Sequence, residues 1–204
     1  MNQKKVVVRR RPKQRRSQET VEAVLDAVIR ILKREGVGAV TTNRIAAVAG
    51  VSIGSVYQYF PDKRAIFVAL HERHAEQIGR LVESTLVQHA NASLAEMLRA
   101  LIEAIADAHV PDPELYELLS TEVPHRAQRG RDLAGRLNGA LRLAIASRAP
   151  KFGNNATLER VLFIVSNMMD ALAHAAVLSR PPRLSLAAAK EESVRAIMAY
   201  LRAS

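Results

Sequence analysis

The stretch from Gly50 to Lys63, GVSIGSVYQYFPDK, places two tyrosines, a glutamine and two serines in quick succession after a glycine. Hydroxyl and amide groups both donate and accept hydrogen bonds, as contacts to base edges and phosphates require. Side chains this polar and crowded are not explained by a core role alone. We therefore predict that this stretch forms a short helix that lies in the major groove of DNA.

Other chemistry finds little support in the sequence. There is no Gly-x-Ser-x-Gly elbow and no Walker loop, and GVGAVT does not fit the dinucleotide fingerprint. His71 and His74 share a helix face near Glu72, but no third metal ligand is evident and such surface pairs are usually inert. We expect no catalytic residues, no metal site and no cofactor.

The composition favours an all-α protein that works in a reducing compartment. Of the 204 residues, 49% are hydrophobic and only 4% aromatic, and there is no cysteine, which excludes disulfides and thiolate metal sites. Charged or polar residues interrupt the apolar stretches, so we expect no membrane span and a cytoplasmic location.

The net charge of +10 is concentrated at the N-terminus. Residues 1–16 contain eight basic and no acidic side chains, whereas residues 17–66 and 67–204 are each close to neutral. We predict a disordered basic arm over residues 1–16 that binds a polyanion. A solubilising tail and a contact with anionic lipid are the alternatives.

Hydrophobic periodicity and capping residues predict helices throughout the rest of the chain. Ser17 and Gly36 bound the first, Thr41 or Thr42 begins the second, and Ser52 begins the third, which reaches about Tyr59. Later helices are predicted over about 63–89, 93–109 (with a Ser93–Glu96 capping box), from Asp112–Pro113, and over 126–149, 157–178 and 185–202.

Residues 42–61 have the spacing of a helix-turn-helix. Ala46 is small where the two helices cross, Gly50 suits a turn with positive φ, and Val56 locks the second helix onto the first. The remaining apolar positions, which complete a small core, are Ile45, Ala49, Val51 and Phe60. We divide the chain into the arm (1–16), a helix-turn-helix domain (17–62) and a larger helical ligand-binding and dimerisation domain (63–204).

Residues 41–67, TTNRIAAVAGVSIGSVYQYFPDKRAIF, resemble the DNA-binding signature of the TetR family of transcriptional regulators. The Tyr-x-Tyr-Phe run, followed after two intervening residues by Lys63, is characteristic, and the resemblance covers about residues 17–70. It implies about nine helices, a homodimer, a palindromic double-stranded DNA operator and a small-molecule effector, and it favours repression. The alternatives are a sequence-neutral architectural DNA-binding protein and, less favoured, an α-helical enzyme.

The predicted DNA contacts come from both helices of the motif. Ser52, Ile53, Gly54 and Ser55 open the second helix, where base edges are read, with Ile53 suited to a thymine methyl group. Gln58 either reads adenine or is merely exposed. In the resemblance, Tyr57 contacts the DNA backbone, Tyr59 also contacts DNA, and Lys63 binds phosphate. The alternatives are that either tyrosine, Tyr59 more than Tyr57, supports the small core and that Lys63 is a solvated surface residue.

Two further groups of residues extend this interface. Thr41, Thr42 and Asn43 begin a helix whose free backbone N–H groups attract phosphate, besides capping it. In the arm, Arg9, Arg10 and Arg11 are suited to a narrow minor groove.

The C-terminal region is expected to pair two subunits and to bind the effector. The helices at 157–178 and 185–202 carry more apolar surface than one packed face needs, so we predict that they form a four-helix dimer interface. Burial within one subunit is the alternative. Candidate pocket residues, each of which could instead belong to the core, are His109, Tyr116, Glu122, Phe163, Asn167 and Met168.

Overall fold

The computed structural model describes residues 15–122, 130–152 and 155–204. These ranges contain nine α-helices, two short 3-10 helices and no strand, which confirms the predicted all-α fold. The helices divide into two compact units. The first holds residues up to 74 and the segment that follows residue 113, and the second holds residues 75–113 and the chain from residue 130 onward.

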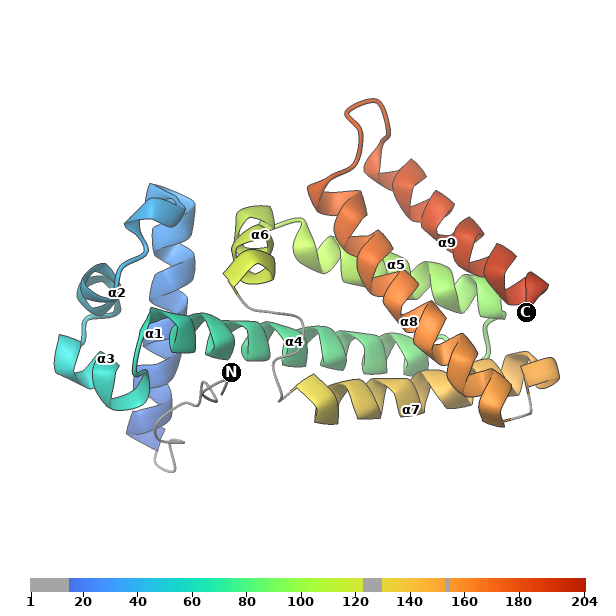
Figure 1. Ribbon diagram of the computed structural model, residues 1–204, viewed down its shortest axis with the longest axis horizontal. Coiled ribbons are helices and arrows are strands. Elements are labelled where there is room, and N and C mark those ends of the chain that lie inside the picture. Colours follow the sequence, from blue (N-terminus) through green and yellow to red (C-terminus); the bar gives the residue numbers. More distant parts are fainter. Residues whose placement is uncertain (1–14, 123–129, 153–154) are drawn as a thin grey trace, which may run out of the picture. The chain divides into compact units, whose positions relative to one another are not determined.

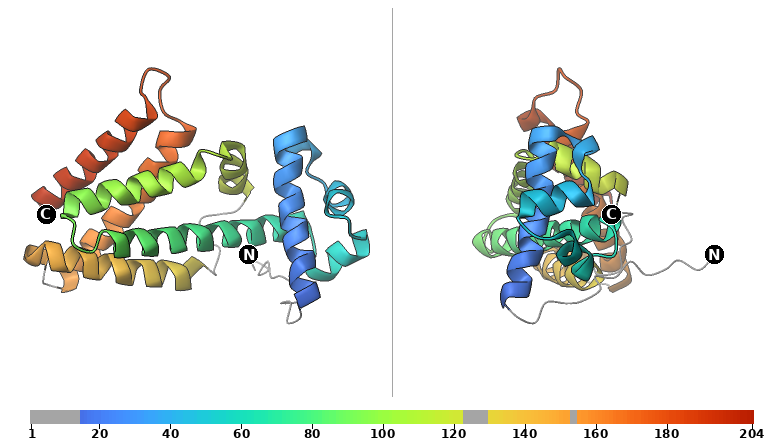
Figure 2. Two further views of the ribbon diagram at one scale, coloured as in Figure 1. Left: turned by 180° about the vertical axis from the view of Figure 1, so that it is seen from behind. Right: turned by 90° about the vertical axis from the view of Figure 1, so that its left-hand side faces the viewer.

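The first unit is built from α1 (Arg15–Glu35), a 3-10 helix (Val37–Ala39), α2 (Thr42–Ala49), α3 (Ile53–Tyr59), the first part of α4 (Lys63–Gln88), and α6 (Pro113–Glu122). Figures 1 and 2 show α2 and α3 lying on one side of α1. Apolar residues from all five α-helices meet in one core, whose largest fully buried members include Ile31, Ile45, Phe60, Ile66, Phe67 and Leu70.

Local signals set the helix ends of this unit, as predicted for Gly36 and Gly50. Gly36 and Gly50 have φ values of 78° and 70°, the left-handed conformation that glycine adopts at no steric cost. The Asp62 carboxylate accepts from the backbone N–H of Ala65 at 2.8 Å and so caps α4. The start of α1 differs from the prediction, because the helix begins at Arg15 and includes Ser17.

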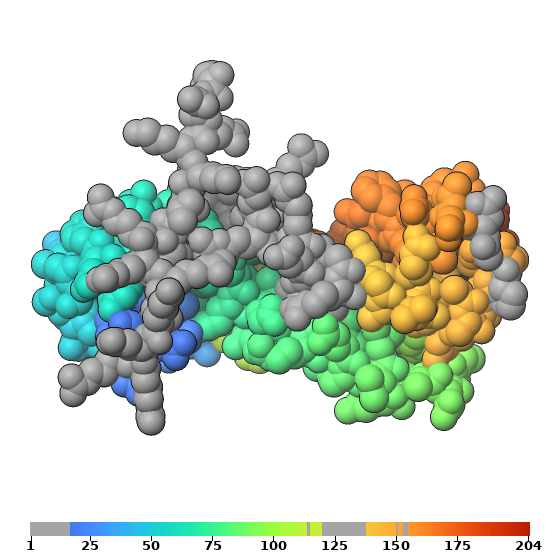
Figure 3. Space-filling model, turned by 90° about the horizontal axis from the view of Figure 1, so that it is seen from below, coloured from blue at the N-terminus to red at the C-terminus, as the bar shows by residue number. Residues whose placement is uncertain are grey.

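The second unit is built from the rest of α4, α5 (Leu94–His109), α7 (Gly130–Arg148), a 3-10 helix (Pro150–Phe152), α8 (Asn155–Leu178) and α9 (Leu186–Ala203). α5 packs against both α8 and α9, and α7 packs against α8. Figure 3 shows α7 and the first turns of α8 side by side. Their buried side chains form a second core, which includes Met97, Leu101, Ile145, Phe152, Val165 and Ile197.

Predicted caps recur in this unit, and long-range polar contacts join its helices. Ser93 and Glu96 form the capping box at the start of α5, where the hydrogen bonds from Ser93 lower the pKa of Glu96. Arg148 donates to the carbonyl oxygens of His89 and Ala92, each at 2.9 Å, and so satisfies backbone groups in the turn after α4. Ser185 caps α9.

Two details of the second unit differ from the sequence-based prediction. Residues 150–152 form a 3-10 helix where a loop was expected, and α8 begins at Asn155 rather than near Thr157. The predicted start of α7 near residue 126 lies outside the described residues, which resume at Gly130.

α8 is the one described helix that is long and apolar enough to cross a membrane by length and composition. The same test is passed by core helices of soluble proteins, and seven α8 residues are buried against the second unit: Leu158, Val161, Leu162, Val165, Met169, Ala173 and Ala176. Packing inside this unit therefore accounts for the apolar residues on the buried face of α8.

Candidate nucleic-acid interface

Two capped helices and one glycine turn position the candidate interface in the first unit. Thr41 caps α2 by accepting from the backbone N–H of Arg44 at 3.2 Å, and Ser52 caps α3 by accepting from that of Ser55 at 3.0 Å. Between them Gly50 takes the left-handed conformation and ends α2. The turn is therefore short and fixed at both sides, as a helix-turn-helix requires.

The two helices have clearly separated inner and outer faces. Ile45, Ala46, Val56 and Phe60 are buried, as the predicted small core requires. Ile53 is 38% exposed and Tyr57 is 44% exposed, although large apolar and aromatic side chains usually avoid water. The other candidates with exposed side chains or backbone are Thr41, Asn43, Ser52, Gly54, Gln58 and Lys63.

A hydroxyl pair links the start of α2 to the middle of α3. The Thr42 Oγ1 and the Tyr57 hydroxyl lie 3.4 Å apart, so the ring of Tyr57 extends from α3 toward the N-terminus of α2. That N-terminus carries backbone N–H groups without intrahelical partners and a partial positive charge. Thr42, Tyr57 and these N–H groups together form a site suited to one phosphate.

A second hydroxyl pair lies at the start of α3. The Ser52 Oγ is 2.8 Å from the Ser55 Oγ in addition to accepting from the Ser55 backbone N–H. The Ser52 hydroxyl thus caps α3, and the Ser55 hydroxyl is paired with it.

Arg44 joins α2 to the end of α1. Its guanidinium donates to both oxygens of Glu35 at the end of α1, with contacts of 2.7, 2.9 and 3.2 Å. This side-chain hydrogen bonding lowers the pKa of Glu35. Arg30 adds a hydrogen bond to the carbonyl of Val48 at 3.3 Å, so polar contacts near both ends of α2 hold it against α1.

Tyr59 was a candidate for DNA contact, and the structure corrects this assignment. Its side chain is only 8% exposed and it belongs to the core of the first unit. A tyrosine two residues after Tyr57 lies about 200° further around the helix, which directs it inward. The core role left open by the sequence analysis is therefore the one that the structure favours.

Lys63 is exposed at the first position of α4, and its Nζ lies 5.4 Å from the ring centroid of Phe67. A cation is unfavourable at a helix N-terminus because the helix dipole is positive there. A phosphate bound at this helix end would compensate both positive charges, as the predicted phosphate-binding role of Lys63 requires. Arg9, Arg10 and Arg11 lie outside the described residues.

The candidate pocket residues are divided between the two units and differ in exposure. Tyr116 is in the first unit, where its hydroxyl lies 3.3 Å from the His74 Nδ1, while His109 is buried in the second unit. Phe163 is 67% exposed and Asn167 is exposed, so both lie on the outer face of α8. Met168 is half-buried, and the side chain of Glu122 lies outside the described side chains.

His109 packs edge-to-face against His174 of α8, with ring centroids 4.4 Å apart. Burial lowers the pKa of His109, whereas a side-chain hydrogen bond to Asp170 raises the pKa of His174. Protonation of His174 is therefore favoured over protonation of His109. No sequence signal indicates that these two histidines, 65 positions apart in the chain, would meet.

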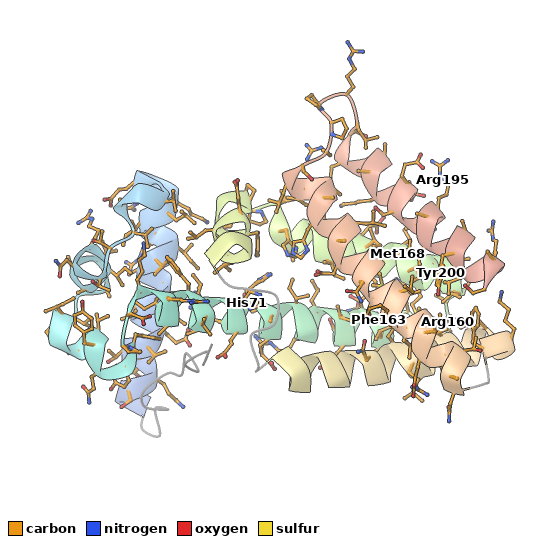
Figure 4. The ribbon with its side chains drawn as sticks, in the orientation of Figure 1. His71, Arg160, Phe163, Met168, Arg195 and Tyr200 are labelled. Atoms are coloured by element: carbon orange, nitrogen blue, oxygen red, sulfur yellow. The ribbon has the colours of Figure 1, made fainter. Side chains whose placement is uncertain are left out.

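Metal binding by His71 and His74 finds no support in the described ranges, which hold no group of three or more histidine, cysteine, aspartate or glutamate side chains able to bind a metal ion. Figure 4 shows His71 on α4, and the ring of His74 lies 4.4 Å from that of Tyr116. His74 therefore takes part in packing α6 onto α4.

Comparison with known proteins agrees with this geometry. Residues 24–70 match the family model described as bacterial regulatory proteins, tetR family, and residues 93–201 match the model described as tetracyclin repressor-like, C-terminal domain. The second match alone covers more than half of the chain.

Individual relatives match over shorter stretches. The chain is 32% identical over 108 residues to the nucleoid occlusion factor SlmA of Glaesserella parasuis, which is 50% of this chain and 50% of that protein. It is 35% identical over 65 residues to the HTH-type transcriptional regulator AcrR of Shigella flexneri, covering 32% of this chain and 30% of that one. The chain thus spans about half the length, or less, of these curated relatives.

Solved structures share the fold over nearly the whole chain. A TetR-family regulator from Streptomyces coelicolor superposes with a TM-score of 0.63 at 24% identity, covering 89% of this chain and 97% of the other. Thermus thermophilus FadR, a repressor solved in complex with lauroyl-CoA, superposes with a TM-score of 0.60 at 22% identity, covering 87% and 93%.

Proposed function

This chain belongs to the TetR family of bacterial regulatory proteins, and we propose that it is a sequence-specific DNA-binding transcriptional regulator. It binds a palindromic operator in double-stranded DNA as a homodimer and acts as a repressor that a small molecule releases. The observation that carries this proposal is the outer face of α2 and α3, where the Thr42 and Tyr57 hydroxyls lie 3.4 Å apart beside exposed Ile53, Gly54 and Gln58.

The proposed contacts fall into two groups with different consequences. Thr42, Tyr57 and Lys63 bind phosphates and fix the position of α3 on the duplex, but they carry no sequence information. Asn43 and the first residues of α3 lie beside them and read base edges in the major groove. The Arg9–Arg11 segment adds minor-groove contacts in this proposal.

Removal of the two hydroxyls tests the phosphate site. Tyr57→Phe and Thr42→Val should each weaken binding to a duplex selected from a random-sequence library, and to a scrambled duplex, by a similar factor, since phosphate contacts are independent of sequence. Ser84→Ala, which removes an exposed hydroxyl in the second unit, is the matched control. Unchanged affinity for both duplexes in both variants would refute the phosphate role.

Dimerisation is proposed through α8 and α9. Figure 4 shows Arg160, Phe163 and Met168 along α8 and Tyr200 on the neighbouring α9. Phe163 is 67% exposed, and Met168 on the same helix is half-buried, so α8 carries apolar side chains that packing in its own subunit does not cover. A second copy of the chain is the proposed occupant, because a palindromic operator is read by a two-fold symmetric protein.

A small-molecule effector is proposed from family membership, and its chemical class is left to experiment. Lauroyl-CoA is bound by the Thermus thermophilus relative. Of the residues nominated for a pocket, His109 remains the best candidate because it is a polar side chain buried to 1% exposure in the second unit. The proposed location of the protein is the cytoplasm, where its operator is found.

The architectural alternative makes a different prediction for the same DNA assay. A sequence-neutral protein held by its basic arm would bind selected and scrambled duplexes equally at physiological salt. A specific regulator would prefer its operator by a factor of about 10³ or more. Selection from a random library followed by competition with scrambled duplex therefore separates the two functions.

A further inference from the structure

The composition of α3 limits which bases it can read. Guanine is most often recognised in the major groove by a bidentate arginine or lysine, and adenine by asparagine or glutamine. The seven residues of α3, IGSVYQY, contain no cationic side chain and one glutamine, Gln58. The helix itself therefore has the chemistry for adenine and not for guanine.

The arginine of α2 is committed to another contact. The guanidinium of Arg44 donates three hydrogen bonds to the Glu35 carboxylate on α1. Recognition of guanine would require the same bidentate use of the guanidinium donors. To reach a base, the guanidinium would have to leave Glu35 and leave that carboxylate without its cation next to DNA. The structure thus uses Arg44 to hold α2 on α1.

Most hydroxyl groups of the helix-turn-helix also take part in hydrogen bonds within the protein. Ser52 and Ser55 bond to each other, and the Tyr57 hydroxyl is directed to Thr42. This leaves two rows of side chains on the outer face of α3, since residues four apart lie on the same face. One row is Ile53 with Tyr57, and the other is Gly54 with Gln58.

These two rows differ in what they present to a base pair. Ile53 is an exposed apolar side chain, and apolar side chains in the major groove contact the C5-methyl group of thymine. A Cβ added at Gly54 would meet only the Ser52 Oγ, at an ordinary contact distance of 3.7 Å. Packing within the protein therefore does not require a glycine at position 54, whereas close approach of Gln58 to a base does require one.

We infer that this protein reads its operator half-sites through A·T pairs: Ile53 contacts a thymine methyl group and Gln58 bonds bidentately to an adenine. Guanine is not read in the major groove by α2 or α3. This inference rests on the proposed function and extends it to the chemistry of the operator.

Base analogues test the inference on the full-length protein with a duplex selected from a random library. Each thymine of a half-site is replaced in turn by deoxyuridine, which removes only the methyl group. At one position per half-site the replacement should weaken binding about fourfold, the size expected for one buried methyl group. Ile53→Ala should bind the parent duplex more weakly and lose its response to that replacement.

Val87→Ala is the matched control, because Val87 is an apolar side chain exposed in the second unit. It should keep both the affinity and the response to deoxyuridine. Gln58→Ala should lose discrimination at one adenine and retain the methyl response. Guanines replaced by 7-deazaguanine, which lacks the major-groove N7 acceptor, should leave binding by the unaltered protein unchanged.

The outcomes separate failure of the inference from failure of the proposed function. If a duplex is bound specifically but no deoxyuridine weakens binding, the inference is wrong and the function stands. If 7-deazaguanine weakens binding tenfold and Arg44→Gln abolishes that effect, Arg44 reads guanine and the inference is also wrong. If no duplex is preferred over scrambled DNA, the proposed function fails and the inference falls with it.

Discussion

Gly54→Ala should raise the stability of the protein while it weakens binding to DNA. Gly54 is the second residue of α3, its backbone has no positive φ, and an added Cβ would meet only the Ser52 Oγ, at an ordinary contact distance of 3.7 Å. Glycine in a helix costs about 0.5–1 kcal/mol relative to alanine. Since Gly54 lies in the first turn, we expect a gain near the lower value, or about 1–2 °C in Tm for a chain of this size.

The effect on binding has the opposite sign. A methyl group at the closest point of α3 would hold the helix away from the base edges and disturb the contacts of both Ile53 and Gln58. We expect at least about a tenfold loss of affinity, which corresponds to about 1.4 kcal/mol. Thermal melting followed by circular dichroism measures the first effect, and fluorescence anisotropy with a labelled operator duplex measures the second.

Gly139→Ala provides the matched control. Gly139 is exposed in α7 of the second unit and has open space around it, so alanine should stabilise the helix there as well and leave DNA affinity unchanged. Undiminished affinity in Gly54→Ala would refute close approach of α3 to the duplex. A loss of stability would instead show that the glycine serves packing inside the first unit.

Three further predictions address the turn, the second unit and the dimer. Gly50→Ala should destabilise the protein by about 1 kcal/mol, measured by urea unfolding, because the φ of 70° is strained for alanine. Phe163→Glu should convert a dimer to a monomer in sedimentation velocity, and an unchanged mass would refute the interface. Burial lowers the pKa of His109, so below about pH 6.5 the unfolded chain binds a proton more readily than the folded chain does, and the folded state loses stability. His109→Asn removes this group and should therefore reduce the loss of Tm between about pH 8 and pH 5. Equal pH profiles for His109→Asn and the unaltered protein would contradict that reasoning.

Features set by neighbouring residues were predictable from the sequence. The caps at Ser52 and Asp62, the capping box at Ser93 and the turn at Gly50 each depend on a few consecutive residues. The periodicity of apolar residues then determined which faces of α2 and α3 turn inward. These local rules account for the fold class and for most of the candidate interface.

Contacts between distant residues were not predictable in the same way. Arg44 and Glu35 lie on different helices nine positions apart, Arg99 and Glu191 lie 92 positions apart, and nothing in the chain marks either pair in advance. These unpredicted ion pairs matter because the Arg44–Glu35 pair decides whether the Arg44 guanidinium is available to a base.

The outward position of Phe163 illustrates a second limit of sequence analysis. α8 is apolar around most of its circumference, so periodicity identifies no unique inward stripe. Phe163 and Asn167 were accordingly nominated for an interior pocket, although both lie on the outer face. Only the positions of α5, α7 and α9 determine which stripe of α8 is covered.

The most direct test of the central claim, that the outer face of α3 reads DNA sequence, is the ratio of affinities for a selected operator and a scrambled duplex at about 0.15 M salt. We predict a ratio of about 10³ or more for the unaltered protein. In the double variant Ile53→Ala, Gln58→Ala this ratio should fall at least about tenfold while affinity for the scrambled duplex is retained, since phosphate contacts remain. A double variant that keeps the full ratio would contradict the account.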